Sequence, residues 1–165
     1  MKLSDLAALP FTYAEVGATA GSLPDGYHHV RKSAVIGRGR RRFDEAAARV
    51  MRWGMLRGAG VGVEATSEMA QLGAEVIVHL GPARAPCRVI YVIDEPDRRG
   101  FAYGTLPGHA ESGEELFAVR FDPATENVYA EVTAFSRHGT WWSRLGAPVT
   151  SLIQRVVTDR YLRAL

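Results

Sequence analysis

The sequence lacks the features that mark secreted and membrane proteins. Its one cysteine, Cys87, cannot form an internal disulfide and lies in the apolar run "PCRVIYVI", a setting typical of a buried structural thiol in a reducing compartment. No stretch approaches the ~20 apolar residues that span a bilayer. Asp5 and Pro10 interrupt the N-terminal apolar stretch, unlike the continuous hydrophobic region of a signal peptide. We therefore expect a cytoplasmic protein with no transmembrane segment.

An excess of charge of one sign is also missing. The 20 basic and 18 acidic residues leave a net charge of +2, too weak a field to indicate nucleic acid as a partner. The five histidines do not stand at the spacing of metal ligands, and no nucleophile motif such as G-x-S-x-G occurs. The sequence thus predicts no metal site, no cofactor and no nucleic-acid partner. It leaves open whether the protein is an enzyme and which oligomer it forms.

The composition is that of an ordinary globular domain. The chain has 165 residues, 47% of them hydrophobic and 23% charged, and a domain of this size buries roughly 70% of its unfolded surface. No repeat or low-complexity linker marks a boundary. We expect residues 1–165 to fold as a single domain.

Apolar periodicity predicts the order of the elements. From Val149 onward, apolar residues recur at helical spacing, and Pro148 suits a first helical position, so residues 148–164 are predicted to form a long amphipathic helix. The segment "RFDEAAARVMRWGMLRG", residues 42–58, predicts a second helix. Short β-like segments separated by turn-rich pieces predict strands over residues 28–37, 61–65, 75–80, 87–93, 101–106, 114–121 and 127–135.

This order predicts an α+β fold. Short links favour antiparallel neighbours, and an antiparallel sheet of about seven strands that grips the long C-terminal helix would bury the apolar stripe of that helix. The arrangement matches the helix-grip architecture of START-like and pollen-allergen-like proteins, which bind lipids and small molecules. Topology alone does not give a function.

Several local motifs carry a closer resemblance. They are "YAEVGAT" (13–19), "PDGY" (24–27), "IGRGRRRF" (36–43), "FAYGTLPGHAESGEELF" (101–117), "AFSR" (134–137) and the terminal "YLRAL". Together they make the chain resemble, over nearly its whole length, the family named domain of unknown function 1990 (DUF1990). The resemblance implies no reaction and no ligand.

The longest of these motifs is the candidate site. With strands over 101–106 and 114–121, the segment "PGHAESG" becomes a rim loop set by its proline and glycines. Tyr103 and Phe117 are expected to line one interior wall, and a cavity between the sheet and the terminal helix is expected to use these two residues with Thr105 and Phe135.

The rim loop also concentrates ionisable side chains: His109, Glu111, Glu114 and Glu115. A functional interpretation pairs His109 with Glu114 as base and orienting carboxylate. Adjacent Glu114 and Glu115 point to opposite faces of a strand, so at most one points inward. An inward glutamate requires a partner, which Arg137 or Arg31 could supply. The alternative is structural, with these glutamates accepting backbone hydrogen bonds that fix the loop.

The run "GRGRRRF" places four arginines between Arg38 and Arg42, ahead of a helix. A helix N-terminus can hold an anion, but the run lacks the lysine and hydroxyl of a P-loop. A solvated turn beside acidic neighbours explains the same pattern.

Three functions remain open. The first is a binding module for a small apolar or amphipathic ligand, with Tyr103, Thr105, His109, Glu114, Phe117, Phe135 and Arg137 as binding residues. The second is an enzyme that uses His109 and Glu114 as acid and base in the same cavity. The third is an interaction protein that uses the arginine run.

Overall fold

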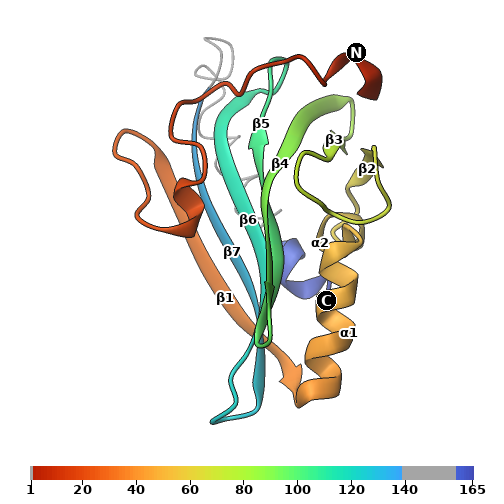
Figure 1. The fold of residues 1–165 in the computed structure, drawn as a ribbon, viewed down its shortest axis with the longest axis vertical. Helices are drawn as coiled ribbons and strands as arrows, with labels where there is room; N and C mark the ends of the chain where they lie inside the picture. The colour runs from red at the N-terminus through yellow and green to blue at the C-terminus, as the bar shows by residue number, and fades with distance from the viewer. Residues whose placement is uncertain (1, 139–158) are drawn as a thin grey trace.

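The computed structural model describes residues 2–138 and 159–165. A seven-stranded antiparallel sheet dominates this part of the chain, in the order β1-β7-β6-β5-β4-β3-β2 (Figure 1). The strands are β1 (His28–Arg38), β2 (Gly62–Ala65), β3 (Glu75–Leu80), β4 (Ala83–Glu95), β5 (Arg98–Thr105), β6 (Glu111–Phe121) and β7 (Asn127–His138). From β2 to β7 each strand pairs with the next in sequence, and β1 pairs with β7. The predicted antiparallel sheet is therefore confirmed.

The predicted helix over residues 42–58 is divided in two. Helix α1 spans Arg40–Met51 and α2 spans Gly54–Gly58, because Trp53 between them has a left-handed backbone with φ of 64°. The buried Trp53 indole donates from Nε1 to the Ser67 carbonyl at 3.2 Å. A Cβ atom on the next residue, Gly54, would overlap the Arg49 carbonyl oxygen, so the sharp turn requires glycine there.

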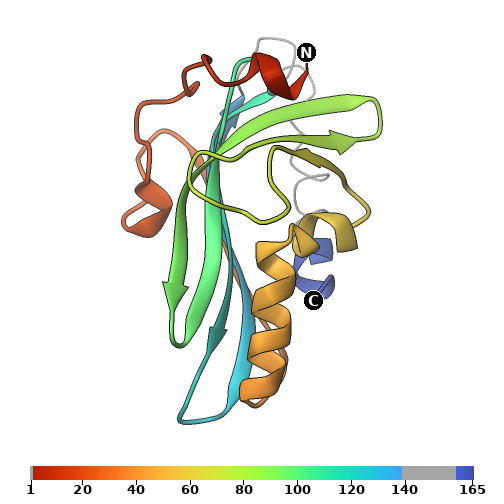
Figure 2. The ribbon, with the colours of Figure 1, turned by 45° about the vertical axis from the view of Figure 1, so that its right-hand side comes forward.

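The two faces of the sheet are covered by different parts of the chain. Helices α1 and α2 and residues 159–165 pack on one face, here called the inner face, and residues 2–27 run along the other, the outer face (Figures 1 and 2). Alternate residues of β6 separate accordingly. Phe117 and Val119 belong to the main core, whereas Leu116 and Ala118 belong to a small separate cluster on the outer face.

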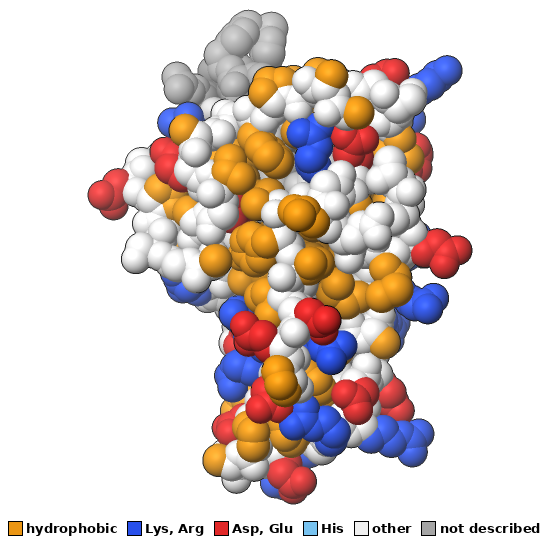
Figure 3. All heavy atoms as spheres, viewed as in Figure 1, with side chains coloured by type: hydrophobic (Ala, Val, Ile, Leu, Met, Phe, Trp, Pro, Cys, Tyr) orange, Lys and Arg blue, Asp and Glu red, His pale blue; other side chains and the backbone are white. Residues whose placement is uncertain are grey.

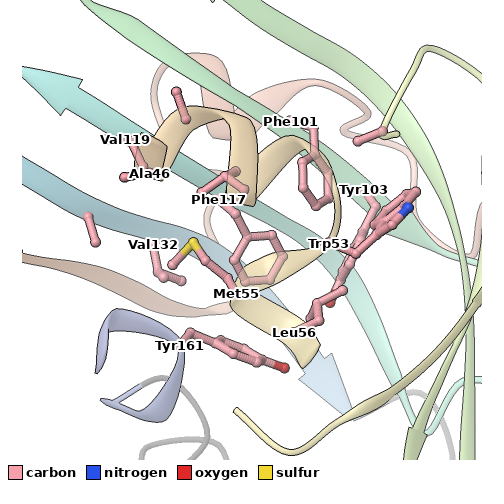
Figure 4. Packing of buried hydrophobic residues seen from close by; sticks show 14 of the residues in the cluster. Ala46, Trp53, Met55, Leu56, Phe101, Tyr103, Phe117, Val119, Val132 and Tyr161 are labelled. Carbon is pink, nitrogen blue, oxygen red and sulfur yellow. The ribbon is translucent and has the colours of Figure 1, made fainter. Parts of the chain in front are cut away.

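Aromatic rings fill the middle of the inner face (Figure 4). The ring of Trp53 from the helix junction meets Phe101 edge-on with centroids 5.0 Å apart, and Tyr161 meets Phe117 at 5.1 Å. The ring centroids of Tyr103 and Phe117 lie 5.4 Å apart, so these two residues share one interior wall as expected. The middle of the inner face is therefore solid core, because Trp53, Phe101 and Phe117 are almost fully buried.

The C-terminal residues dock against α2 and the start of α1. Residues 159–163 are helical, and Tyr161 and Leu162 are buried. Residues 148–158, the remainder of the predicted long helix, lie outside the described residues. Gly58 permits close approach of Ala164, whose carbonyl oxygen would lie 3.0 Å from a Cβ at that position.

No helix within residues 2–138 and 159–165 has the length and apolar character needed to cross a bilayer.

Candidate functional site

The candidate site lies at the end of the inner face beside the turn from β5 to β6. Directly opposed residues of antiparallel strands share a face, and Glu115 stands opposite Tyr103 of β5 and Ala134 of β7. Two residues along β6, Gly113 stands opposite Ser136. A cavity of about 50 Å³ opens here, with walls that include Tyr103, Thr105, His109, Glu111, Glu115 and Ser136.

Glu115 is the central acid of this cavity. The buried Tyr103 hydroxyl donates a hydrogen bond to its Oε2 atom at 3.1 Å. Burial raises the pKa of Glu115 to about 7, with a smaller contribution from the nearby Glu111 charge, although the Tyr103 hydrogen bond opposes the rise. Burial also holds the pKa of Tyr103 well above its usual value, so its phenol stays protonated. The pair therefore offers a carboxyl group that exchanges a proton near neutral pH.

His109 and Glu111 complete the polar part of the cavity. The Nδ1 atom of His109 accepts a hydrogen bond from the Glu111 amide at 2.9 Å, and burial lowers the pKa of His109 to about 4. The imidazole is thus neutral at physiological pH, and its remaining proton lies on Nε2. Burial raises the pKa of Glu111, while a hydrogen bond with Ser136 opposes the rise.

Glu114 points to the outer face and is fully engaged there. Its Oε2 accepts from the Tyr13 hydroxyl at 2.8 Å and the Gly17 amide at 2.7 Å, and its Oε1 accepts from the Thr19 amide at 3.0 Å and the Thr19 hydroxyl. No contact between His109 and Glu114 occurs among the described interactions. Glu114 instead fastens the N-terminal segment to the sheet, a structural role in which backbone hydrogen bonds take part.

The two arginines expected to pair with an inward glutamate have other partners. Arg31 donates to the Gly21 carbonyl at 3.0 Å, and the Arg137 guanidinium lies 4.8 Å from the centre of the Tyr27 ring. The donors that Glu114 actually uses precede it by about a hundred residues, so no local pattern indicated them. The inward glutamate is Glu115, whose described hydrogen-bond donor is Tyr103, so the expectation that Arg31 or Arg137 pairs with the inward glutamate is wrong.

Phe135 also makes its contacts on the outer face. The centroid of its ring lies 5.5 Å from that of Tyr13 and 5.0 Å from that of Tyr27, and both contacts are edge-on. The cavity borders the residues Glu114 and Phe135, but their side-chain partners belong to the N-terminal segment. The structure thus divides the predicted set: Tyr103 and Phe117 lie on the inner face with His109 at the cavity, whereas Glu114, Phe135 and Arg137 have outer-face partners.

Thr105 holds the rim loop in place. Its hydroxyl donates to the Gly113 carbonyl at 3.2 Å, accepts from the Gly113 amide at 3.0 Å, and lies 2.5 Å from the Thr12 hydroxyl. These bonds join the end of β5 to β6 and to the N-terminal segment, so they stiffen the cavity wall.

Of the acids near the rim loop, Glu115 is the one whose side chain points to the inner face with Tyr103. Strand alternation could have indicated this placement. Phe117 and Val119 are apolar and interior, and Glu115 lies on the same strand face as they do, whereas Glu114 lies on the opposite face. Proximity of Glu114 to His109 in the sequence was the misleading cue.

The arginine run is engaged within the chain. Figure 3 shows acidic and basic side chains interspersed at the lower end of the molecule, near the hairpins and the start of α1. Arg38 bonds the Thr125 carbonyl at 3.0 Å, Arg40 pairs with Asp97 at 2.6 Å, Arg41 pairs with Glu45 at 2.9 Å, and Arg42 bonds the Ile36 carbonyl at 3.0 Å and the Leu165 carbonyl. All four side chains therefore have intramolecular partners.

In the described part of the chain, no group of three or more potential ligands could hold a metal ion.

Comparison with known proteins identifies the family. The model of the domain of unknown function (DUF1990) matches residues 12–164. The chain belongs to the DUF1990 family. The resemblance inferred from the motifs is confirmed. A UPF0548 protein of Deinococcus radiodurans is 35% identical over 173 aligned positions, which cover 93% of this chain and 85% of that protein. A UPF0548 protein of Arabidopsis thaliana is 37% identical over 76 positions, covering 42% of this chain and 37% of that protein.

Solved structures of similar shape support the fold assignment alone. A hypothetical protein from Helicobacter pylori has a TM-score of 0.62 with 5% identity, covering 93% of this chain and 95% of that one. A point mutant of norcoclaurine synthase from Thalictrum, in complex with a transition-state analogue, has a TM-score of 0.56 with 9% identity, covering 86% of this chain and 96% of that one. The DUF1990 chain therefore shares its architecture with proteins of very different sequence.

Proposed function

We propose that this DUF1990 protein binds a small amphipathic ligand at the inner face of its sheet, with the polar end of the ligand in the cavity beside Glu115. The observation that carries the proposal is a carboxyl group at the end of an aromatic wall. Glu115 lies on the same strand face as Phe117 and opposite Tyr103, and it opens onto a cavity of about 50 Å³. Binding sites typically combine apolar walls with a few polar groups that orient the ligand.

The packing of the core limits where such a ligand lies. The middle of the inner face is filled by Trp53, Phe101 and Phe117, so the ligand would occupy the rim end. We propose that the predicted helix over residues 148–164 completes the grip on the sheet. The norcoclaurine synthase structure shows that a fold of this architecture can hold a small molecule, which supports the proposal by analogy.

Native mass spectrometry beside denaturing extraction tests the proposal. We expect a stoichiometric small-molecule adduct on the purified protein. A cavity-filling variant, Ala134→Leu, should lose the adduct, because Ala134 lines the cavity opposite Glu115. The same substitution at the exposed Ala48 of α1 is the matched control and should retain it. Equal adduct levels in both variants, or no adduct together with no binding of amphipathic probes, would contradict the proposal.

Acid–base catalysis in the same cavity is a second candidate. A carboxyl with a pKa of about 7, hydrogen-bonded to a buried tyrosine, suits a general acid or base near neutral pH. Glu115, rather than Glu114, would be the acid or base, with His109 as a neutral neighbour. If an extracted ligand is converted by the wild type, Glu115→Gln should abolish the conversion while binding persists. Unchanged turnover in that variant would reject the role.

A further inference from the structure

The walls of the cavity beside Glu115 have an uneven charge balance. They include the carboxyl groups of Glu111 and Glu115, with His138 and His28 near Glu111, and no lysine or arginine belongs to the described lining. His109 does not offset these acids, because its Nδ1 accepts a backbone hydrogen bond and its pKa is lowered to about 4, which keeps it neutral. A ligand that carries positive charge would therefore meet a complementary field.

The Glu115 carboxyl also has unused hydrogen-bonding capacity. Each carboxylate oxygen can accept two hydrogen bonds, and within the described residues only the Tyr103 hydroxyl donates to this group. The Tyr103 oxygen can itself accept a bond. An alkylammonium group presents three N–H donors and no acceptor, so its needs match what these atoms offer.

The size and walls of the cavity favour an organic cation. About 50 Å³ holds a single head group, and the adjoining wall is aromatic, formed by Tyr103 and Phe117. No group of potential ligands suited to a metal ion occurs among residues 2–138 and 159–165. We propose that the cavity receives the protonated amino group of an amphipathic amine, held by the Glu115 carboxylate. This inference rests on the proposed binding function and specifies the chemical class of the ligand.

Amine binding would be linked to the ionisation of Glu115. Several titratable groups face this carboxyl or its neighbour: Tyr103 of β5, Glu111 of β6, Cys87 of β4, Tyr161 of the C-terminal segment, His109 of the turn, His138 of β7 and His28 of β1. Burial keeps the phenols and the thiol protonated, and His109 is neutral. Because Glu115 titrates at about 7, it gives up its proton when an ammonium group binds below that pH.

Isothermal titration calorimetry with hexylamine and hexan-1-ol tests the proposal. The two probes have the same alkyl chain, and the amine stays protonated below about pH 10, as a lysine side chain does. We expect hexylamine to bind the wild type at least about tenfold more tightly than hexan-1-ol at about pH 8. We also expect its affinity to fall between about pH 8 and pH 6, with proton release at the lower pH.

Glu115→Gln should remove both the amine preference and the proton release. Glu45→Gln, which removes a carboxylate from the exposed face of α1, is the charge-matched control and should keep both. Equal binding of the two probes, or tighter binding of hexan-1-ol, would overturn the amine assignment and leave the binding function standing. No binding of either probe to folded wild type also overturns the assignment, and the co-purification experiment then judges the binding function separately. If Glu115→Gln fails to fold, the pH profile of the wild type decides alone.

Discussion

Replacing Glu115 with glutamine should make the protein more stable, by an amount that depends on pH. Glutamine has nearly the shape of a protonated glutamate and can still accept the Tyr103 hydrogen bond seen at 3.1 Å. It cannot ionise, so it avoids the cost of a buried charge. The wild type bears that cost at every pH at which Glu115 is ionised.

The size of the effect follows from the pKa of Glu115, which rises from 4.5 to about 7. Below pH 4.5 this group is protonated in both the folded and the unfolded chain, so it contributes no pH dependence. Between pH 4.5 and about pH 7, Glu115 is ionised in the unfolded chain but still protonated in the folded protein. The free energy of unfolding therefore falls as pH rises through this range. A pKa difference of one between the folded and unfolded states corresponds to about 1.4 kcal/mol of unfolding free energy. Because Glu115 is partly open to the cavity, which weakens the effect, we expect the unfolding free energy to fall by about 2–3 kcal/mol in total.

Urea unfolding of the wild type and Glu115→Gln at a series of pH values measures this loss. The difference in unfolding free energy should grow from its value near pH 4.5 by about 2–3 kcal/mol up to pH 8 and then level off. His109 and Glu111 also titrate with shifted pKa values, but they are present in both proteins and cancel in the difference to first order. A difference that stays constant across this range would refute the placement of Glu115 in a buried cavity.

Three further substitutions test the contacts that shape the site and its surroundings. Glu114→Gln should destabilise the protein by about 2–4 kcal/mol in urea unfolding, because the new amide group faces donors that now bond a carboxylate; a cost below about 1 kcal/mol would contradict the described hydrogen bonds. Gly54→Ala should lower stability by about 1–3 kcal/mol in thermal unfolding through its clash with the Arg49 carbonyl, whereas Gly21→Ala, with nothing within 4 Å of the added Cβ, should be near neutral. Arg42→Ala should cost about 1–2 kcal/mol, because it loses the bonds to the Ile36 and Leu165 carbonyls, and equal stability would show that these bonds contribute little.

Local patterns in the sequence were sufficient for most of the sheet. Alternating apolar residues and short turn-rich links predicted the strands, and each predicted strand has a counterpart in β1 to β7. The one helix predicted over residues 42–58 was too long, because apolar periodicity continues through Trp53, whereas the left-handed backbone of Trp53 separates α1 from α2. At this junction Trp53 packs against Phe101, a contact between residues almost fifty positions apart that local periodicity does not encode.

The sequence by itself determined that Glu114 and Glu115 point to opposite faces, since successive side chains of a strand always do. It also determined the family, because the motifs of the chain resemble DUF1990 and the family model matches residues 12–164. Only the tertiary structure decided what covers each face. Tyr13, Gly17 and Thr19 reach Glu114 from the far end of the chain, and Tyr103 reaches Glu115 across the β5–β6 pair. These long-range contacts set the environment of each carboxyl, and local periodicity does not encode them.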